Sequence, residues 1–299
     1  MTRAFTGNLA HTQTVSHHIP PPIVCRKRTF DFSERPFIMG IVNVTPDSFS
    51  DGGSYFSPEQ AVAHGLRLAE EGADIIDIGG ESTRPGAAPV SAAEETERVL
   101  PVIAALAANI DVPLSIDTTK AEVARKALAA GAEIVNDVSA LCFDPEMGDV
   151  VAAARVPVVL MHMRGTPRTM QHDIHYQSLM DDIREFLEER LEYAVSVGIA
   201  LENIIIDPGI GFGKSIEQDN LSILKNLAAF TALGRPILVG TSRKGFIGKL
   251  LGTPVHEREE GTAATVAIAV YNGAHMVRVH DVKSMKMVAA VANAIRKAQ

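Results

Sequence analysis

Eight short apolar segments run along this chain, and each leads directly into a cluster of polar residues. A short apolar run that ends in Gly, Asp, Ser or Asn is typical of a buried β-strand followed by a loop. When parallel strands close into a barrel, the loops after their carboxyl ends share one face and carry the active site. The pattern therefore predicts both a parallel α/β barrel and the face on which it works. The segments are 38–53, 74–87, 113–120, 133–140, 158–165, 204–215, 237–245 and 276–282.

Length and charge fit one such barrel. The chain has 299 residues, and a (β/α)8 barrel uses about 250 as a single domain. A net charge of −8 without a basic block argues against nucleic acid as a partner, but it allows a small anion held by a few local cations. No run reaches the ~18 apolar residues of a membrane span, and no secretory signal is evident. We therefore expect a cytoplasmic protein with no membrane or nucleic-acid partner.

The two cysteines give no sign of a metal or disulfide site. Cys25 and Cys142 lie far apart and lack the CxxC spacing of zinc or redox motifs. Because Cys142 lies in an apolar stretch, we interpret it as a buried apolar side chain.

The segment before the barrel is short. Residues 1–22 are polar and end in consecutive prolines, which predicts a disordered tail. We interpret the histidines of this tail as solvated side chains rather than metal ligands. Residues 23–37 favour a short antiparallel hairpin, with Ser33 and Glu34 near a turn. The predicted division is a tail over 1–22 and one barrel domain over 23–299.

Helix signals alternate with the strands, as βα units require. The predicted starts are Ser57-Pro58, Ser91 to Glu94 and Thr119 to Glu122, the last two as capping boxes. The predicted ends lie at Gly72, Gly131, Gly198, Gly234 and Gly273. Residues 177–197 have helical apolar spacing. Eight such units with right-handed crossovers form a single (β/α)8 TIM barrel. An open doubly wound sheet is the alternative, but it would gather ligands at one switch point rather than after every strand.

Three polar side chains stand out because each follows an apolar run at a predicted strand end. Asp117, Asn136 and Asp207 close the third, fourth and sixth segments. Two carboxylates and a carboxamide above a packed core can read the hydrogen-bonding groups of a flat ring. Alternatively, the two carboxylates only cap loops or helix starts. Paired carboxylates also suit acid–base catalysis, although no spacing here selects it.

The candidate cations are Arg84, Lys244, Arg278 and His280, with Arg243 beside Lys244. Arg278 and His280 alternate along one strand, so their side chains point to the same side. With Asp281 as a helix cap they resemble an anion clamp, because arginine supplies a planar fork and a helix start supplies free N–H groups. Any of them could instead be a surface ion-pair partner, and this alternative weighs most for Arg243.

Three loops at the predicted active face are rich in glycine or proline. Residues 209–215 match a phosphate loop only faintly, because the GxxxxGK[ST] spacing is absent, and they suit a turn with positive φ equally well. We interpret residues 45–54 and 82–88 as mobile lids, or as ordinary connections if the face were inert.

Together these segments resemble the dihydropteroate synthases of folate biosynthesis. The most specific motifs are NVTPDSFSDGG at 43–53 and GGESTRPGA at 79–87, and DPGIGFGKS, GTSRKGFIG and RVHDV add support. The resemblance implies a barrel that condenses the diphosphate ester of 6-hydroxymethyl-7,8-dihydropterin with 4-aminobenzoate, with Mg2+ as cofactor. It further implies an SN1-like route and a homodimer formed through the late barrel helices.

The resemblance also implies roles for single residues. It assigns Mg2+ to Asn43, and the diphosphate and 4-aminobenzoate to Thr83 and Arg84. The implied pterin pocket is Asp117, Asn136, Asp207 and Lys244. The implied diphosphate anchor is Arg278 and His280, and Phe212 and Ser242 are implied near the 4-aminobenzoate channel. The predicted catalytic residues are Asp117, Lys244, Arg278 and His280.

Two rival functions share part of this pattern. A pterin domain of a corrinoid-linked methyltransferase has the barrel and the pterin-facing acids, but it has no use for a diphosphate clamp at Arg84, Arg278 and His280. A non-catalytic pterin-binding homologue would keep the fold without turnover. An assay with the pterin diphosphate and 4-aminobenzoate separates these alternatives.

Overall fold

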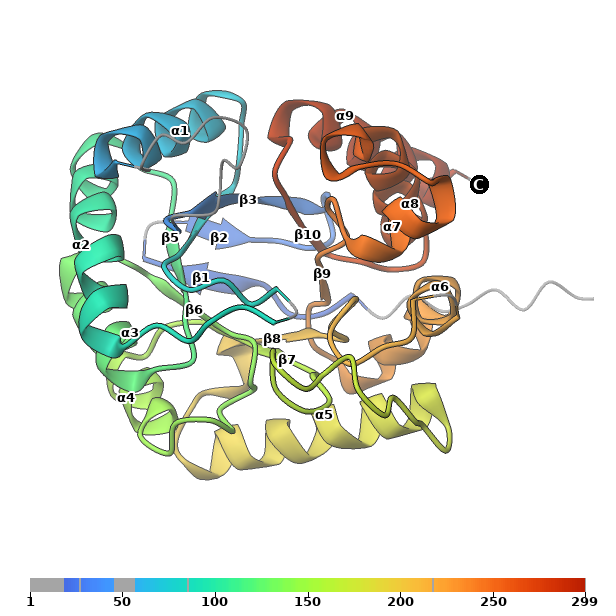
Figure 1. The fold of residues 1–299 in the computed structure, drawn as a ribbon, viewed down its shortest axis with the longest axis horizontal. Coiled ribbons are helices and arrows are strands. Elements are labelled where there is room, and N and C mark those ends of the chain that lie inside the picture. Colours follow the sequence, from blue (N-terminus) through green and yellow to red (C-terminus); the bar gives the residue numbers. More distant parts are fainter. Residues whose placement is uncertain (1–18, 27, 46–56, 85, 217, 299) are drawn as a thin grey trace, which may run out of the picture.

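Eight parallel strands form the barrel that the sequence predicts (Figure 1). The computed structural model describes residues 19–26, 28–45, 57–84, 86–216 and 218–298. Neighbouring strands follow the order β8, β7, β6, β5, β4, β3, β10, β9, and an isolated bridge between Ile206 and Ile237 closes the ring. The strands are β3 (Phe37–Asn43), β4 (Ile75–Gly79), β5 (Leu114–Asp117), β6 (Ile134–Asp137), β7 (Val158–Met161), β8 (Ile204–Asp207), β9 (Leu238–Val239) and β10 (Met276–Val279).

Helices surround this barrel and cover the outer face of its strands (Figure 1). They are α1 (Pro58–Glu70), α2 (Ala92–Asn109), α3 (Ala121–Ala130), α4 (Met147–Ala154), α5 (Leu179–Ser196), α6 (Asp219–Lys225), α7 (Gly245–Leu251), α8 (Glu259–Tyr271) and α9 (Val282–Lys297). Short 3-10 helices lie at η1 (Leu201–Asn203), η2 (Leu227–Leu233) and η3 (Val255–Glu257). Within the described ranges, no helix has both the length and the apolar character needed to span a bilayer.

Two of the three predicted helix starts are confirmed. Ser57 caps α1 with a complete capping box, and Ser91 caps α2 by accepting from the Glu94 N–H. The third is wrong, because Lys120 rather than Thr119 is the N-cap residue of α3 and makes no side-chain cap bond. Instead, the Asp144 carboxylate accepts from the Ala121 N–H at 2.8 Å. A residue from the next βα unit thus replaces the local cap.

The predicted hairpin covers the amino-terminal end of the barrel. Strands β1 (Ile23–Cys25) and β2 (Arg28–Phe30) pair antiparallel, and Ser33 and Glu34 lie in the turn that follows. The buried side chains of the hairpin form one apolar cluster with residues at the start of the barrel strands, among them Phe37. This end is therefore filled by side chains, and the opposite end is left for ligands. Most of the predicted tail, residues 1–18, lies outside the described residues.

The prediction for Cys142 is wrong, because its side chain is exposed. Ala140 and Leu141 both adopt positive φ, at 53° and 65°, and turn the chain just after β6. An apolar stretch normally indicates burial, but this tight turn directs the thiol outward.

Candidate active site

Arg278 joins the ends of several strands at the carboxyl-terminal end of the barrel. Its Nε donates to Asp77 Oδ2 at 2.6 Å, and its Nη2 donates to Asp117 Oδ2 at 2.7 Å. Asn136 Nδ2 donates to the same Asp77 oxygen at 2.9 Å. Side chains from β4, β5, β6 and β10 therefore form one buried network. Three of its four members were predicted, and Asp77 was missed.

The two predicted ring-reading carboxyls titrate close to neutral pH. Burial raises the pKa of Asp117 to about 7, although the positive charge of Arg278 opposes the shift. Burial likewise raises the pKa of Asp207 to about 6, against the Gly209 N–H that donates to it at 2.7 Å and the charge of Lys244. Each group is therefore an acceptor that becomes fully available only above its raised pKa.

Lys244 completes the central cluster from the start of α7. Its Nζ lies 4.0 Å from the centroid of the Phe212 ring, which is cation–π distance. Burial lowers the pKa of Lys244 to about 8, with Arg278 as a further cause, while Asp207 and Asp117 oppose the shift. The structure thus brings the predicted pterin residues around a common point.

His280 and Ser242, which were predicted in different roles, lie in contact beside this cluster. The Ser242 hydroxyl lies 2.9 Å from His280 Nδ1. Burial lowers the pKa of His280 to about 3, and the charges of Arg243, Arg278 and Arg84 lower it further. His280, predicted as a cation, is therefore neutral at pH 7 without a ligand. The surrounding positive charges favour an anion, which would raise this pKa again.

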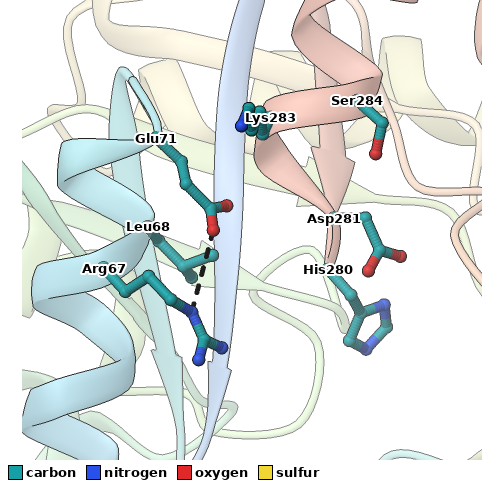
Figure 2. Close-up of a pocket in the computed structure, with 7 residues that line it drawn as sticks. All are labelled: Arg67, Leu68, Glu71, His280, Asp281, Lys283 and Ser284. Carbon is teal, nitrogen blue, oxygen red and sulfur yellow. Dashed lines mark ion pairs between the residues drawn. The ribbon is translucent and has the colours of Figure 1, made fainter.

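Arg243 has the ion-pair role that was the alternative for it. Its Nη2 lies 2.6 Å from Asp281 Oδ1, and Asp281, the N-cap residue of α9, makes no side-chain cap bond. Figure 2 shows His280 and Asp281 at one side of a pocket, facing Arg67 of α1 and Glu71, the residue that follows this helix. Carboxylates balance the positive charges in this pocket. An anion is therefore favoured less in the pocket than in the region between the three arginines that act on His280.

Asn43, Thr83 and Arg84 lie at the rim of this face. Asn43 ends β3 in register with Gly79, and Thr83 and Arg84 lie in the loop between β4 and α2. Arg84 is exposed and acts on His280 through its charge. Residues 46–54 of the predicted first lid, and Pro85 of the second, lie outside the described residues.

The donor set at the end of β3 fits a metal that arrives with its substrate. Within the described ranges, no three His, Cys, Asp or Glu side chains gather as a metal site. Asn43 offers a neutral amide oxygen at the strand end. Mg2+ keeps several waters and is usually held by one or two protein ligands together with substrate phosphates. An amide oxygen of this kind is chemically compatible with Mg2+ whose other ligands are waters and substrate phosphates.

The loop after β8 is a turn with positive φ, and its lysine points inward. Lys214 is fully buried, and its Nζ lies 2.6 Å from His162 Nδ1 and donates to the His162 carbonyl at 3.0 Å. Gly209 has φ +73°, and a Cβ there would lie 1.9 Å from that carbonyl oxygen. Lys214 therefore fastens the loop that follows Asp207, and the faint likeness to a phosphate loop is not supported. Sequence reasoning missed this role, although a lysine inside a glycine-rich turn was its signal.

The barrel and the cluster at its carboxyl end define a pterin-binding enzyme. The family described as "Pterin binding enzyme" matches residues 39–280 of this chain. The dihydropteroate synthase of Synechocystis sp. is 49% identical over 282 residues, which cover 94% of this chain and 97% of that relative. The chain belongs to the dihydropteroate synthase family, whose members are transferases.

Solved structures agree with this assignment. Dihydropteroate synthase of Xanthomonas albilineans with 4-aminobenzoic acid superposes with a TM-score of 0.86 at 48% identity, covering 94% of this chain and 100% of that one. The same enzyme in complex with 7,8-dihydropteroate gives a TM-score of 0.83 at 46% identity, covering 93% and 100%.

Proposed function

We propose that this chain condenses (7,8-dihydropterin-6-yl)methyl diphosphate with 4-aminobenzoate, giving 7,8-dihydropteroate and pyrophosphate. The observation that carries the proposal is the convergence of Asp117, Asp207, Lys244 and Arg278 at the open end of the barrel. The ligands of the two solved family members described above support the same substrate pair.

The pterin-reading part of the site follows from the chemistry of the ring. Dihydropterin presents a 2-amino group and ring N–H donors, which Asp117 and Asp207 can accept. Lys244 can donate to the ring carbonyl or to a ring nitrogen. Asn136, held by Asp77 at 2.9 Å, has its amide oxygen left for the ligand. Acceptors and donors are thus placed around one flat ligand.

The reaction needs electrostatics more than a covalent nucleophile. We propose that the bond between the methylene carbon and the diphosphate oxygen breaks first, with the electron pair leaving on oxygen. The carboxylates of Asp117 and Asp207 stabilise the cation that remains on the dihydropterin. The arylamine lone pair then forms the C–N bond, and the nitrogen passes a proton to the released diphosphate or to water. Arg278 and His280 hold the departing diphosphate.

Mg2+ belongs to this proposal as a partner of the diphosphate. Asn43 would hold it, and when bound it would neutralise charge on the leaving group. The other groups at the anion side, Thr83 and Arg84, lie on the loop after β4 and would contact the diphosphate and 4-aminobenzoate. Phe212 and Ser242 would border the 4-aminobenzoate channel.

An assay of the purified chain with both substrates and Mg2+ tests the proposed function. We expect dihydropteroate and pyrophosphate to appear in equal amounts. Pterin binding without turnover would favour a non-catalytic homologue. Methyl transfer to a corrinoid, with no pyrophosphate, would favour the methyltransferase alternative.

Calorimetry tests the metal prediction. Mg2+ alone should bind the protein weakly, because one amide oxygen cannot hold a metal that keeps most of its waters. Mg2+ added with pyrophosphate should bind clearly, and Asn43→Ala should weaken that binding by roughly tenfold, a loss of one metal contact. Tight uptake of Mg2+ by the free protein would instead point to a preformed carboxylate site.

The outer face of α8 and α9 supports a homodimer. Met287, Val291 and Ile295 follow one face of α9 and are 59–61% exposed, and Ile268 and Tyr271 are about half exposed on α8, which packs beside α9 (Figure 1). Exposed apolar patches of this kind mark interaction sites. We propose that a second copy of the chain covers this patch. The cytoplasmic location stays a prediction.

Sedimentation at micromolar concentration tests the dimer. The parent chain should have twice the mass of one chain, and Val291→Glu should raise the dissociation constant by about 100-fold or more, since a buried unpaired charge costs several kcal/mol. Val195→Glu is the matched control, because Val195 is 47% exposed on α5 at a distance from α9 (Figure 1). A monomeric parent, or equal effects of both changes, would contradict the proposal.

A further inference from the structure

Three charged side chains outside the pterin pocket form a cluster at the base of the loop after β4. Lys120 Nζ donates to Glu81 Oε2 and to Glu95 Oε2, both at 2.5 Å. The Glu95 side chain is fully buried, whereas those of Glu81 and Lys120 are 22% and 24% exposed. We call Glu81, Lys120 and Glu95 the loop cluster.

The loop cluster lies between two segments that carry predicted substrate contacts. Lys120 comes three residues after Asp117, at the N-cap of α3. Glu81 comes two residues before Thr83, in the loop that also carries Arg84. The ammonium of Lys120 therefore connects the strand end of the pterin pocket to the loop of the 4-aminobenzoate side.

Further contacts fasten the base of this loop. The second oxygen of Glu81 accepts from the Val90 N–H at 3.0 Å, so one carboxylate joins both ends of the loop. Arg98 Nη1 donates to the Gly80 carbonyl at 2.8 Å. A Cβ at Gly80 would lie 2.8 Å from a methyl group of Val99, so the base is pressed against α2. The position of Glu81 thus sets where the described part of the loop leaves the barrel.

The arrangement of the loop cluster depends most on the positive charge of Lys120. Two carboxylates share a single ammonium, and burial raises the pKa of Glu95. Without the cation, the carboxylates of Glu81 and Glu95 would repel each other at short range. Glu95 is held inside the protein, so Glu81 would move outward and take the start of the loop with it.

We propose that Lys120 is a positioning residue of the reaction, which fixes Thr83 and Arg84 for 4-aminobenzoate and the diphosphate by holding Glu81 against Glu95. The inference rests on the proposed function, and it assigns to Lys120 a larger effect on 4-aminobenzoate than on the pterin diphosphate, whose ring is held by groups outside this loop.

Steady-state kinetics of Lys120→Met provide the test. The KM for 4-aminobenzoate should rise roughly 10- to 100-fold, the cost of misplacing a substrate contact by about 1 Å. The KM for the pterin diphosphate should rise much less, because Asp117 keeps Arg278 as its partner. Lys126→Met is the matched control, since Lys126 pairs with Glu122 on the exposed side of the same helix, and it should change neither constant.

Two further single variants keep the test informative if the methionine variant folds poorly, and one double variant extends it. Lys120→Arg should recover most of the 4-aminobenzoate affinity, because a guanidinium can also bridge two carboxylates. Glu81→Gln should raise the same KM, and its combination with Lys120→Met should add little, as expected for partners in one contact. Equal changes in both KM values, or a lower Tm alone, would overturn the inference. A parent chain without any turnover would contradict the proposed function itself, and the inference with it.

Discussion

Replacing Asp117 with asparagine is expected to lower turnover and pterin affinity by roughly 10- to 100-fold, since a lost charged acceptor costs about 1–3 kcal/mol. The amide is nearly isosteric, but it offers donors where the pterin ring also presents donors. It also removes the negative charge that Arg278 Nη2 contacts at 2.7 Å. Calorimetry with a pterin ligand and the condensation assay measure the two effects separately.

The pH dependence of pterin affinity shows whether the lost affinity belongs to the Asp117 carboxylate. Because the pKa of Asp117 is raised to about 7, pterin affinity of the parent should increase as pH rises through 7 and the carboxyl ionises. The variant should lose this increase and keep the one near 6 that belongs to Asp207. Asp111→Asn, an exposed change before the start of β5, is the control. An unchanged pH profile in the Asp117 variant would mean that the pocket is wrongly assigned.

Arg278→Met is expected to abolish measurable activity and to destabilise the fold by about 3–5 kcal/mol, as when one partner of a buried ion pair is removed. Asp77 and Asp117 would then face each other without the cation that both contact. The free energy of unfolding measures this loss. Arg125→Met is the control, because Arg125 and Glu146 form an exposed pair that should contribute at most about 1 kcal/mol.

The loss in Arg278→Met should also depend on pH, with a defined sign. Without Arg278, burial and the neighbouring carboxylate keep the pKa of Asp117 above its unfolded value of 3.8. In the parent this pKa is already about 7, so parent and variant both lose stability between pH 4 and 7, and removal of the cation raises the pKa further. The extra loss in the variant should therefore grow as pH rises above about 7. A difference in unfolding free energy between parent and variant that shrinks as pH rises above 7 would contradict the ion-pair geometry.

Features that depend on neighbours in the chain could be predicted from the sequence. An apolar run that ends in a polar residue places Asp117 and Asp207 at strand ends, wherever the barrel closes. Ser57 and Pro58 begin α1 as predicted, because a cap and its partner lie within one helical turn. The positive-φ glycines that end the helices follow from the same local logic.

Features that depend on distant partners could not be predicted. Asp77 lies inside an apolar strand, and its partner Arg278 is 201 residues further along the chain. Nothing near Asp77 shows that its burial is compensated. The prediction of the α3 cap was wrong for the same reason. Asp144, which accepts from the Ala121 N–H, belongs to another βα unit, and Lys120 donates to Glu81 instead. Pairings of this kind appear only when the ring is closed.

The strands of the barrel are not paired equally around the ring, and this affects what a bound ligand does to the stability of the barrel. Between β8 and β9 the ring is joined by an isolated bridge, at Ile206 and Ile237, whereas β3 and β4 pair over five positions. Asp207 ends one strand of this seam, and Lys244 follows the other. A pterin ring held by both would supply cross-links that the backbone lacks there. Occupancy should therefore oppose the opening of the barrel at its weakest join, so that substrate serves as part of the scaffold while it is bound.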